Sequence, residues 1–284
     1  MGLLDGLEGF GLGGLKGMKL YEDPQEEKKE PEPEPEEKKP EEKDFLMDKE
    51  YECQVCGKKT KQRIVRTGKA KMKSQDMDLR PVFEELDVIK YDVVVCPFCG
   101  YAVLARYYAP MAKPHRQMIR EKISANFKQM PTFLPQTISY EDAVTRYKLA
   151  LLNAVVRQAK NSEKAFICLK SAWLLRGMRY DADIETSEGR ARAMQCKKQE
   201  LEYLINAQEG FLKARSTEPF PIAGMDENTL DYLISALCLE TNRNLPDAVK
   251  LLGGLLTAKN ASKNIKDRAE DMLERIKGQM RDAM

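Results

Sequence analysis

Cys53-Gln54-Val55-Cys56-Gly57 and Cys96-Pro97-Phe98-Cys99-Gly100 are two matching segments that decide the fold of the first half of this chain. In each segment two cysteines are separated by two residues and followed by glycine. A C-x-x-C turn places two sulfur atoms within reach of one ion, and Zn²⁺ prefers four ligands in a tetrahedron. The glycines suit the left-handed backbone that such turns commonly need. We therefore predict a closed, structural zinc site with the ligands Cys53, Cys56, Cys96 and Cys99.

Two other chemistries use cysteines in a similar pattern. The segment Cys96-Pro97-Phe98-Cys99 resembles the dithiol of glutaredoxins. A redox site needs only one such pair, however, and the βαβ pattern of that fold is missing. An iron–sulfur cluster also uses four cysteines, but no other feature indicates one. Zinc is the favoured cofactor, and a thiol redox enzyme is the less favoured alternative.

Signals for catalysis are sparse. His115 is the only histidine, so a catalytic zinc site with histidine ligands and a nucleophile–histidine pair both lack support. We find no glycine-rich phosphate-binding loop. Carboxylates alone can perform acid–base chemistry. The sequence therefore leaves enzymatic activity open while favouring a non-enzymatic protein.

Residues 45–112 are predicted to form a small zinc-ribbon-like β module. Polar and apolar residues alternate imperfectly from Lys61 to Lys73 and more clearly from Val88 to Val95, and both stretches are strand candidates. The two cysteine pairs are separated by residues 57–95, and this separation is longer than the usual spacing in zinc ribbons. A hairpin between the two turns would accommodate this length.

The same module is rich in basic side chains, and residues 57–73 contain no acidic one. Alternate basic residues on a hairpin would share a face and could follow a phosphate backbone. Acidic residues follow at once, and the stacking aromatics of a single-strand binder are sparse, so a solvated face is the simpler interpretation. The alternative nucleic-acid surface would comprise Lys58, Lys59, Lys61, Arg63, Arg66, Lys69, Lys71 and Lys73.

Residues 113–284 show the periodicity of long helices. The predicted helices are 115–128, 140–160, 163–179, 188–215, 228–242, 246–258 and 263–282. The remaining cysteines lie on their apolar or mixed faces and are interpreted as small buried hydrophobic residues; they are Cys168, Cys196 and Cys238.

Two helix pairs match the tetratricopeptide pattern, in which two helices form a repeat. The first pair has Leu149, Leu152 and Val156 followed by Ala165, Leu169 and Ala172. The second has Tyr232, Ala236 and Leu239 followed by Ala248, Leu252 and Leu255. We therefore predict an α-helical, tetratricopeptide-like domain in which these side chains form core and the concave face forms a binding surface.

The N-terminal residues differ in composition from the rest. Residues 1–21 are rich in glycine and leucine, which fits either a fraying tail or a short segment that docks into a groove. Residues 22–44 are dominated by Pro, Glu and Lys. They contain too few apolar side chains to offset their ordering entropy, which predicts a disordered linker.

Charge and cysteine content indicate the cellular location of the protein and the classes of partner it binds. The chain has 47 basic and 45 acidic side chains and a net charge of +2, so no global field marks a nucleic-acid or membrane protein. The seven cysteines are too sparse for a secreted disulfide scaffold. The first residues lack the basic start of a signal peptide, and no apolar run is long enough to cross a membrane. We expect a reduced, cytoplasmic protein without membrane association.

The sequence resembles the bacterial family catalogued as domain of unknown function 2225. The resemblance rests on residues 53–58, on Tyr91-Asp92-Val93-Val94-Val95 leading into residues 96–102, and on the helices that follow. It covers roughly residues 45–260. It implies the architecture and a bacterial cytoplasmic origin, and it brings no established activity.

Together these features predict an α+β, mostly α-helical protein that acts as a non-enzymatic scaffold or adaptor. Its helical domain would bind a protein or peptide partner. The second hypothesis is a nucleic-acid-associated factor that uses the basic hairpin.

Overall fold

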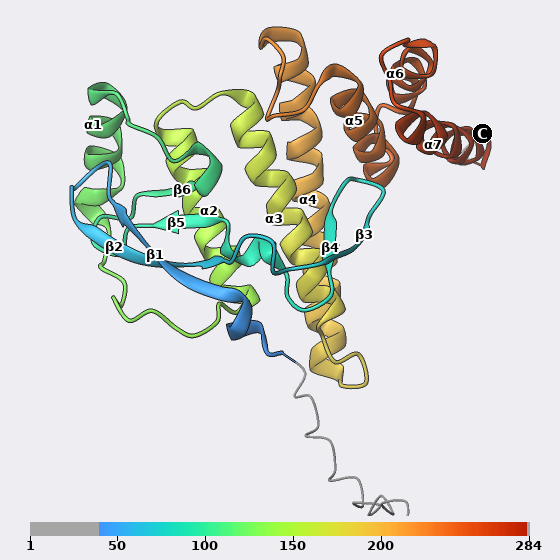
Figure 1. The fold of residues 1–284 in the computed structure, drawn as a ribbon. Helices are drawn as coiled ribbons and strands as arrows, with labels where there is room; N and C mark the ends of the chain where they lie inside the picture. Colours follow the sequence, from blue (N-terminus) through green and yellow to red (C-terminus); the bar gives the residue numbers. More distant parts are fainter. Residues whose placement is uncertain (1–39, 283–284) are drawn as a thin grey trace, which may run out of the picture. The chain divides into compact units, whose positions relative to one another are not determined.

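In the computed structural model, which describes residues 40–282, six short strands precede seven α-helices (Figure 1). The strands are β1 (Leu46–Glu52), β2 (Lys59–Val65), β3 (Met72–Gln75), β4 (Pro81–Phe83), β5 (Val93–Val95) and β6 (Ala102–Leu104). The helices are α1 (Lys113–Lys122), α2 (Tyr140–Val156), α3 (Asn161–Tyr180), α4 (Ser187–Thr217), α5 (Glu227–Thr241), α6 (Leu245–Thr257) and α7 (Lys263–Asp282). The fold is thus mostly helical, with small antiparallel strand pairs near its start.

The strands form three separate antiparallel pairs, β1–β2, β3–β4 and β5–β6. The first knuckle, residues 53–57, lies between β1 and β2, and the second knuckle, residues 96–100, lies between β5 and β6. Each knuckle is therefore the tip of a hairpin, which allows two hairpins to bring their cysteines together.

The β5–β6 hairpin lies between two hydrophobic clusters. Because successive side chains of a strand point to opposite faces, Val93 and Val95 join the main core formed with the helices, while Val94 faces the cysteines. In β6, Leu104 belongs to the main core and Val103 to the cysteine cluster. This hairpin connects the candidate metal centre to the helical core.

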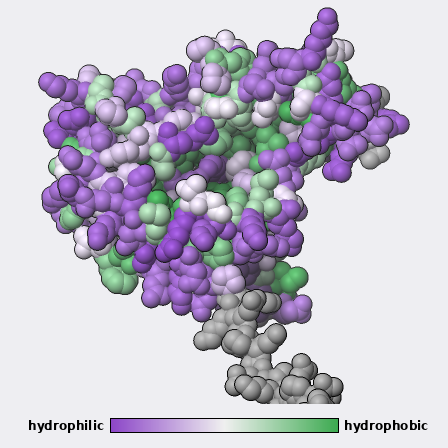
Figure 2. All heavy atoms as spheres, viewed as in Figure 1, coloured by the Kyte–Doolittle hydropathy of each residue, from purple (hydrophilic) through white to green (hydrophobic). Residues whose placement is uncertain are grey.

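The helices contact one another in chain order from α2 to α7 (Figure 1). The strand pairs and the helices belong to one compact unit. In the view of Figure 2 the surface is mostly hydrophilic, with hydrophobic residues in small patches.

Most predicted core positions of the two helix pairs are buried or half-buried, but Leu152 is 49% exposed, so its assignment to the core is wrong. The predicted burial of Cys168, Cys196 and Cys238 is confirmed.

Several predicted element boundaries are wrong. The strand candidate Lys61–Lys73 is extended only up to Val65 and again from Met72, and the helix expected over 140–160 ends at Val156. The strand expected over Val88–Val95 starts with a 3₁₀ helix, Val88–Tyr91, because the Asp87 side chain accepts a hydrogen bond from the backbone of Ile89. The helix expected over 115–128 ends at Lys122, and a 3₁₀ turn follows at Ser124–Asn126. Residues 42–44 belong to a 3₁₀ helix and not to a disordered linker. The predicted segment 1–21 and the linker up to residue 39 lie outside the described residues.

The connecting segment, residues 66–87, explains the long spacing between the knuckles. It contains β3 and β4 and reaches helices far along the chain. Arg268 of α7 donates hydrogen bonds to Gln75 Oε1 (2.7 Å) and to the Asp76 carbonyl (2.8 Å). Trp173 Nε1 of α3 donates to Asp78 (2.7 Å). The residues between the knuckles therefore tie the strand pairs to the helices.

Candidate metal centre

The four cysteine sulfurs converge on one point. All four Sγ atoms lie within 4.8 Å of one another. Two cross-knuckle distances are 3.5 Å, between Cys53 and Cys99, and 3.6 Å, between Cys56 and Cys96. A tetrahedral zinc with Zn–S bonds of about 2.3 Å requires sulfur separations of about 3.8 Å. The donor set therefore fits a four-coordinate, thiolate-bound metal ion.

The two knuckles have the same local structure. In the first, the Cys53 N–H donates to the Lys58 carbonyl and the Gly57 N–H donates to the Cys53 carbonyl. In the second, the Cys96 N–H donates to Tyr101 and the Gly100 N–H donates to Cys96. The glycine φ angles are +75° and +73°, a region that favours glycine. The repeated C-x-x-C-G sequence thus produces two nearly equivalent turns.

Backbone and thiol hydrogen bonds make the cysteines electrostatically unequal. Hydrogen bonds from the Cys53 and Cys99 thiols lower the pKa of Cys96 to about 2. Hydrogen bonding to Cys96 raises the pKa of Cys53 to about 12, and the pKa of Cys99 is also raised, mainly through its hydrogen bonds to Cys53 and Cys96. Because thiolates at these distances repel one another, four of them together require a compensating cation.

Five hydrogen bonds attach the knuckles to residues that follow them in the chain. Arg120 Nε and Nη2 donate to the Val55 carbonyl (3.1 and 2.7 Å). Ser124 Oγ donates to the Cys99 carbonyl (2.8 Å), and Asn153 Nδ2 donates to the Gly100 carbonyl (2.9 Å). The Met130 N–H donates to the Pro97 carbonyl (2.9 Å). Side chains outside the ligand set therefore hold both turns, as is common around metal sites.

Apolar contacts reinforce this attachment. Ile119 and Ile123 are buried in the cluster that contains the cysteines. A Cβ atom at Gly100 would lie 2.5 Å from the Phe127 ring, whereas one at Gly57 would meet nothing within 4 Å. Gly100 is thus required by its close neighbour as well as by its backbone angle.

Sequence reasoning missed these supporting residues. Asn153 could have been recognised from the sequence, because it is a polar residue within the apolar stripe of α2. In the structure its side chain is fully buried. Buried polar groups are normally hydrogen-bonded, so such a residue indicates a specific partner. Arg120 and Ser124 have no comparable pattern, since surface helices commonly carry such residues.

The predicted basic surface is partly neutralised in the folded chain. On β1 and β2, Glu52 lies opposite Lys59, Glu50 opposite Lys61, and Asp48 opposite Arg63. Opposite charges in directly facing strand positions attract one another and lower the local positive potential. Of the other members, Lys58 lies over the Phe98 ring, Arg66 donates to the Leu46 carbonyl, and Lys69, Lys71 and Lys73 belong to the connecting segment.

His115 is exposed on α1 and is not a member of the cysteine cluster. Cys168 and Cys238 are also separate from the cluster. Burial raises the pKa of Cys168 to about 12 and that of Cys238 to about 11. These thiols are therefore poor nucleophiles, consistent with packing roles.

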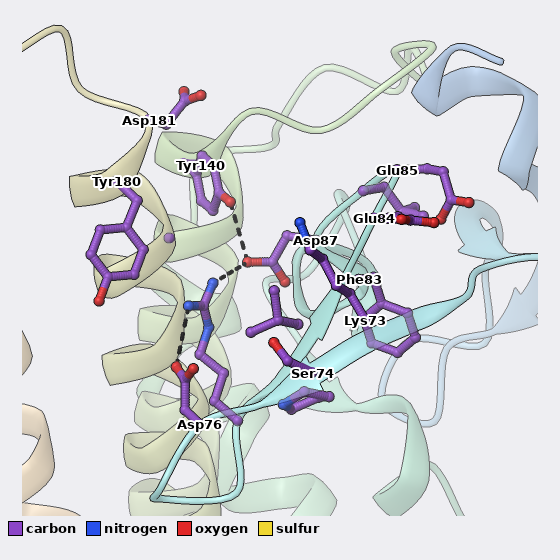
Figure 3. Close-up of a pocket in the computed structure, with 15 residues that line it drawn as sticks. Lys73, Ser74, Asp76, Phe83, Glu84, Glu85, Asp87, Tyr140, Tyr180 and Asp181 are labelled. Carbon is purple, nitrogen blue, oxygen red and sulfur yellow. Dashed lines mark hydrogen bonds and ion pairs between the residues drawn. The ribbon is translucent and has the colours of Figure 1, made fainter. Parts of the chain in front are cut away.

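A pocket of about 570 Å³ lies between the β3–β4 pair and helices α2 and α3 (Figure 3). Its central charged groups are paired with one another. Asp87 accepts hydrogen bonds from Tyr140 (3.2 Å) and Arg80 (3.3 Å), and Arg80 lies 3.6 Å from Asp76. Its lining residues include no histidine or cysteine. This arrangement connects the connecting segment to the helices.

These observations define a mostly helical protein with small antiparallel strand pairs and a four-cysteine candidate metal centre. The chain belongs to the family described as "Uncharacterized protein conserved in bacteria (DUF2225)", whose model matches residues 46–276. This confirms the resemblance predicted from the knuckle sequences. Comparisons with curated proteins and with solved structures found no match. Within residues 40–282, none of the helices combines the length and apolar character needed to cross a membrane.

Proposed function

We propose that Cys53, Cys56, Cys96 and Cys99 hold one structural Zn²⁺ and that the protein is a non-enzymatic scaffold or adaptor. The observation that carries the proposal is the convergence of four cysteine sulfurs from two hairpins. A set of four thiolates fills the tetrahedral coordination of zinc and leaves no position for a reacting water. The ion would therefore contribute to folding and not to catalysis.

The supporting hydrogen bonds indicate what the zinc would stabilise. Arg120 donates to a carbonyl of the first knuckle. Ser124 and Asn153 of α2 each donate to a carbonyl of the second knuckle. A metal ion that fixes the two turns relative to each other would also fix α1 and its following turn. The scaffold role thus extends from the ribbon to the first two helices.

The partner-binding part of the proposal concerns the helical domain. Its consecutive helices contact their neighbours in order, as in tetratricopeptide-like stacks, and such stacks present grooves to protein or peptide ligands. We place the protein in the bacterial cytoplasm, where thiolates remain available to zinc. The nucleic-acid hypothesis has weaker support, because three of its eight basic residues face acidic residues across β1–β2.

Metal removal tests the coupling between the zinc and α1. Chelation is expected to raise amide hydrogen exchange in residues 113–126 by at least about tenfold, because the knuckle carbonyls that hold this segment lose their fixed positions. Exchange in α5 (Glu227–Thr241), which lies in the main core, serves as the internal control and should not change. Equal protection of α1 with and without metal would contradict the proposed scaffold role.

A further inference from the structure

A second pocket, also of about 570 Å³, lies on α4 next to the last residues of α3 and α5. Its floor comes from one face of α4, because Met194, Leu201 and Leu204 follow one another at helical spacing. Met194 is 74% exposed and Leu201 is 43% exposed, whereas Leu204 is buried. The floor of this α4 pocket is therefore apolar and partly open to solvent.

The two carboxylates that line the α4 pocket already have cationic partners. Glu200 lies 2.6 Å from the Arg176 guanidinium and 3.2 Å from that of Arg179. Glu240 lies 2.7 Å from Arg176, which also pairs with the fully buried Asp78 (3.0 Å) in the same network. Burial raises the pKa of Glu240 to about 7, so this group carries only part of its negative charge at neutral pH. These carboxylates therefore leave little negative charge for a ligand.

The basic side chains of the α4 pocket have fewer partners. Lys197 and Lys198 are exposed, and neither forms an ion pair within residues 40–282. Arg179 has its one contact with Glu200, and its N–H groups form no hydrogen bond in the described part of the chain. A guanidinium carries five N–H donors and an ammonium three. Three basic groups at the pocket therefore keep donors for an acceptor on a ligand.

The charges that remain available to a ligand are thus positive, and they border an apolar floor. A basic side chain would meet three like charges, which disfavours it as the occupant. A purely apolar side chain would cover the floor and leave the lysines unpaired. A segment with both apolar and acidic side chains complements both parts of the pocket, and such complementarity gives an interface its specificity.

We propose that the α4 pocket receives an apolar side chain of a protein partner, with aspartate or glutamate residues beside it. The inference rests on the proposed adaptor function and specifies the chemistry of the partner. The apolar side chain packs against Met194 and Leu201 and removes them from water, which favours association. The neighbouring carboxylates pair with Lys197, Lys198 and Arg179 and orient the partner.

The test uses the capped peptide acetyl-Glu-Leu-Leu-Glu-Glu-Leu-amide and a second peptide with glutamine in place of each glutamate. Binding to full-length, zinc-loaded protein carrying ¹³C-labelled methionine methyl groups is followed through the Met194 signal, which Met194→Leu assigns. We expect a saturable shift, with an affinity for the glutamate peptide about tenfold above that for the glutamine peptide. An exposed ion pair contributes up to about fivefold, so two or three of them together account for this difference. A third peptide, with lysine in place of each glutamate, should cause no measurable shift.

Matched variants assign the effect to the α4 pocket. Lys197→Gln combined with Lys198→Gln should remove most of the difference between the glutamate and glutamine peptides. Lys213→Gln, at an exposed lysine of α4 outside the pocket, should leave that difference unchanged. Leu201→Gln should abolish the Met194 shift with both peptides, because it makes the floor polar. Leu152→Gln, at an exposed leucine of α2, should not affect the shift.

Equal affinities for the glutamate and glutamine peptides, or the absence of a saturable shift, would overturn the inference. Equal effects of the pocket and control variants would also overturn it. Zinc content and hydrogen exchange in α1 are measured on the same protein, so failure of the pocket is distinguished from failure of the metal scaffold.

Discussion

Cys96→Ser is expected to lose the bound zinc and to unfold the two knuckle hairpins, while helices α3 to α7 remain folded. Each cysteine supplies one of four ligands, and the free energy of metal binding is folding free energy when the site does not exist in the unfolded chain. The expected loss of stability is about 5 kcal/mol or more, which is large compared with the roughly 5–15 kcal/mol that stabilises a typical domain. Zinc content and urea unfolding are the measurements.

The pattern across variants is as informative as the size of the effect. Serine variants of Cys53, Cys56 and Cys99 should behave like Cys96→Ser, because a closed tetrahedral site has no dispensable ligand. Cys196→Ser is the matched control, since Cys196 is also buried but lies outside the cluster. A redox dithiol would give a different result, in which only Cys96 and Cys99 are needed for function and none of the four is needed for folding.

Arg176→Met is expected to lower the free energy of unfolding by about 3–5 kcal/mol, because it leaves buried carboxylates without their central partner. Asp78 and Glu200 are both buried and both lie within 3.0 Å of the Arg176 guanidinium. Methionine preserves much of the arginine stem, so the measured loss reflects mainly the charge. Urea unfolding followed by Trp173 fluorescence reports the change, since Trp173 donates to Asp78 in the same network.

Arg243→Met provides the control for Arg176→Met. The Arg243 guanidinium lies 3.6 Å from Glu209, and both side chains are about half exposed. Solvent screens such a pair, so its loss should cost at most about 1 kcal/mol. If both variants had the same small effect, the network around Arg176 would not stabilise the connecting segment as described.

The metal centre could be predicted from the sequence because adjacent residues determine the conformation of each cysteine turn. Each C-x-x-C-G turn encodes its own geometry, and the two glycines have the expected positive φ angles. Helix positions were also accessible, because a repeating apolar stripe extends over many residues. The start of α2, for example, follows from Ser139, whose hydroxyl accepts a hydrogen bond from the Asp142 N–H.

The remaining features depend on contacts between distant residues. Arg176 and Asp76 are 100 positions apart, and neither has a local pattern that reveals the pairing. The early end of α1 reflects the bond from Ser124 to the second knuckle, which tertiary structure supplies. Leu152 fits the apolar stripe of its helix but is exposed. The periodicity of a helix does not determine which apolar side chains are covered by a neighbouring helix.

The most direct test of the central claim is native mass spectrometry of freshly purified full-length protein, with metal analysis before and after chelation. We expect one tightly bound zinc ion per chain, and its removal should be accompanied by loss of the folded knuckle hairpins. A metal-free, fully folded protein with a reversibly titrating Cys96–Cys99 disulfide would contradict it and favour the redox alternative.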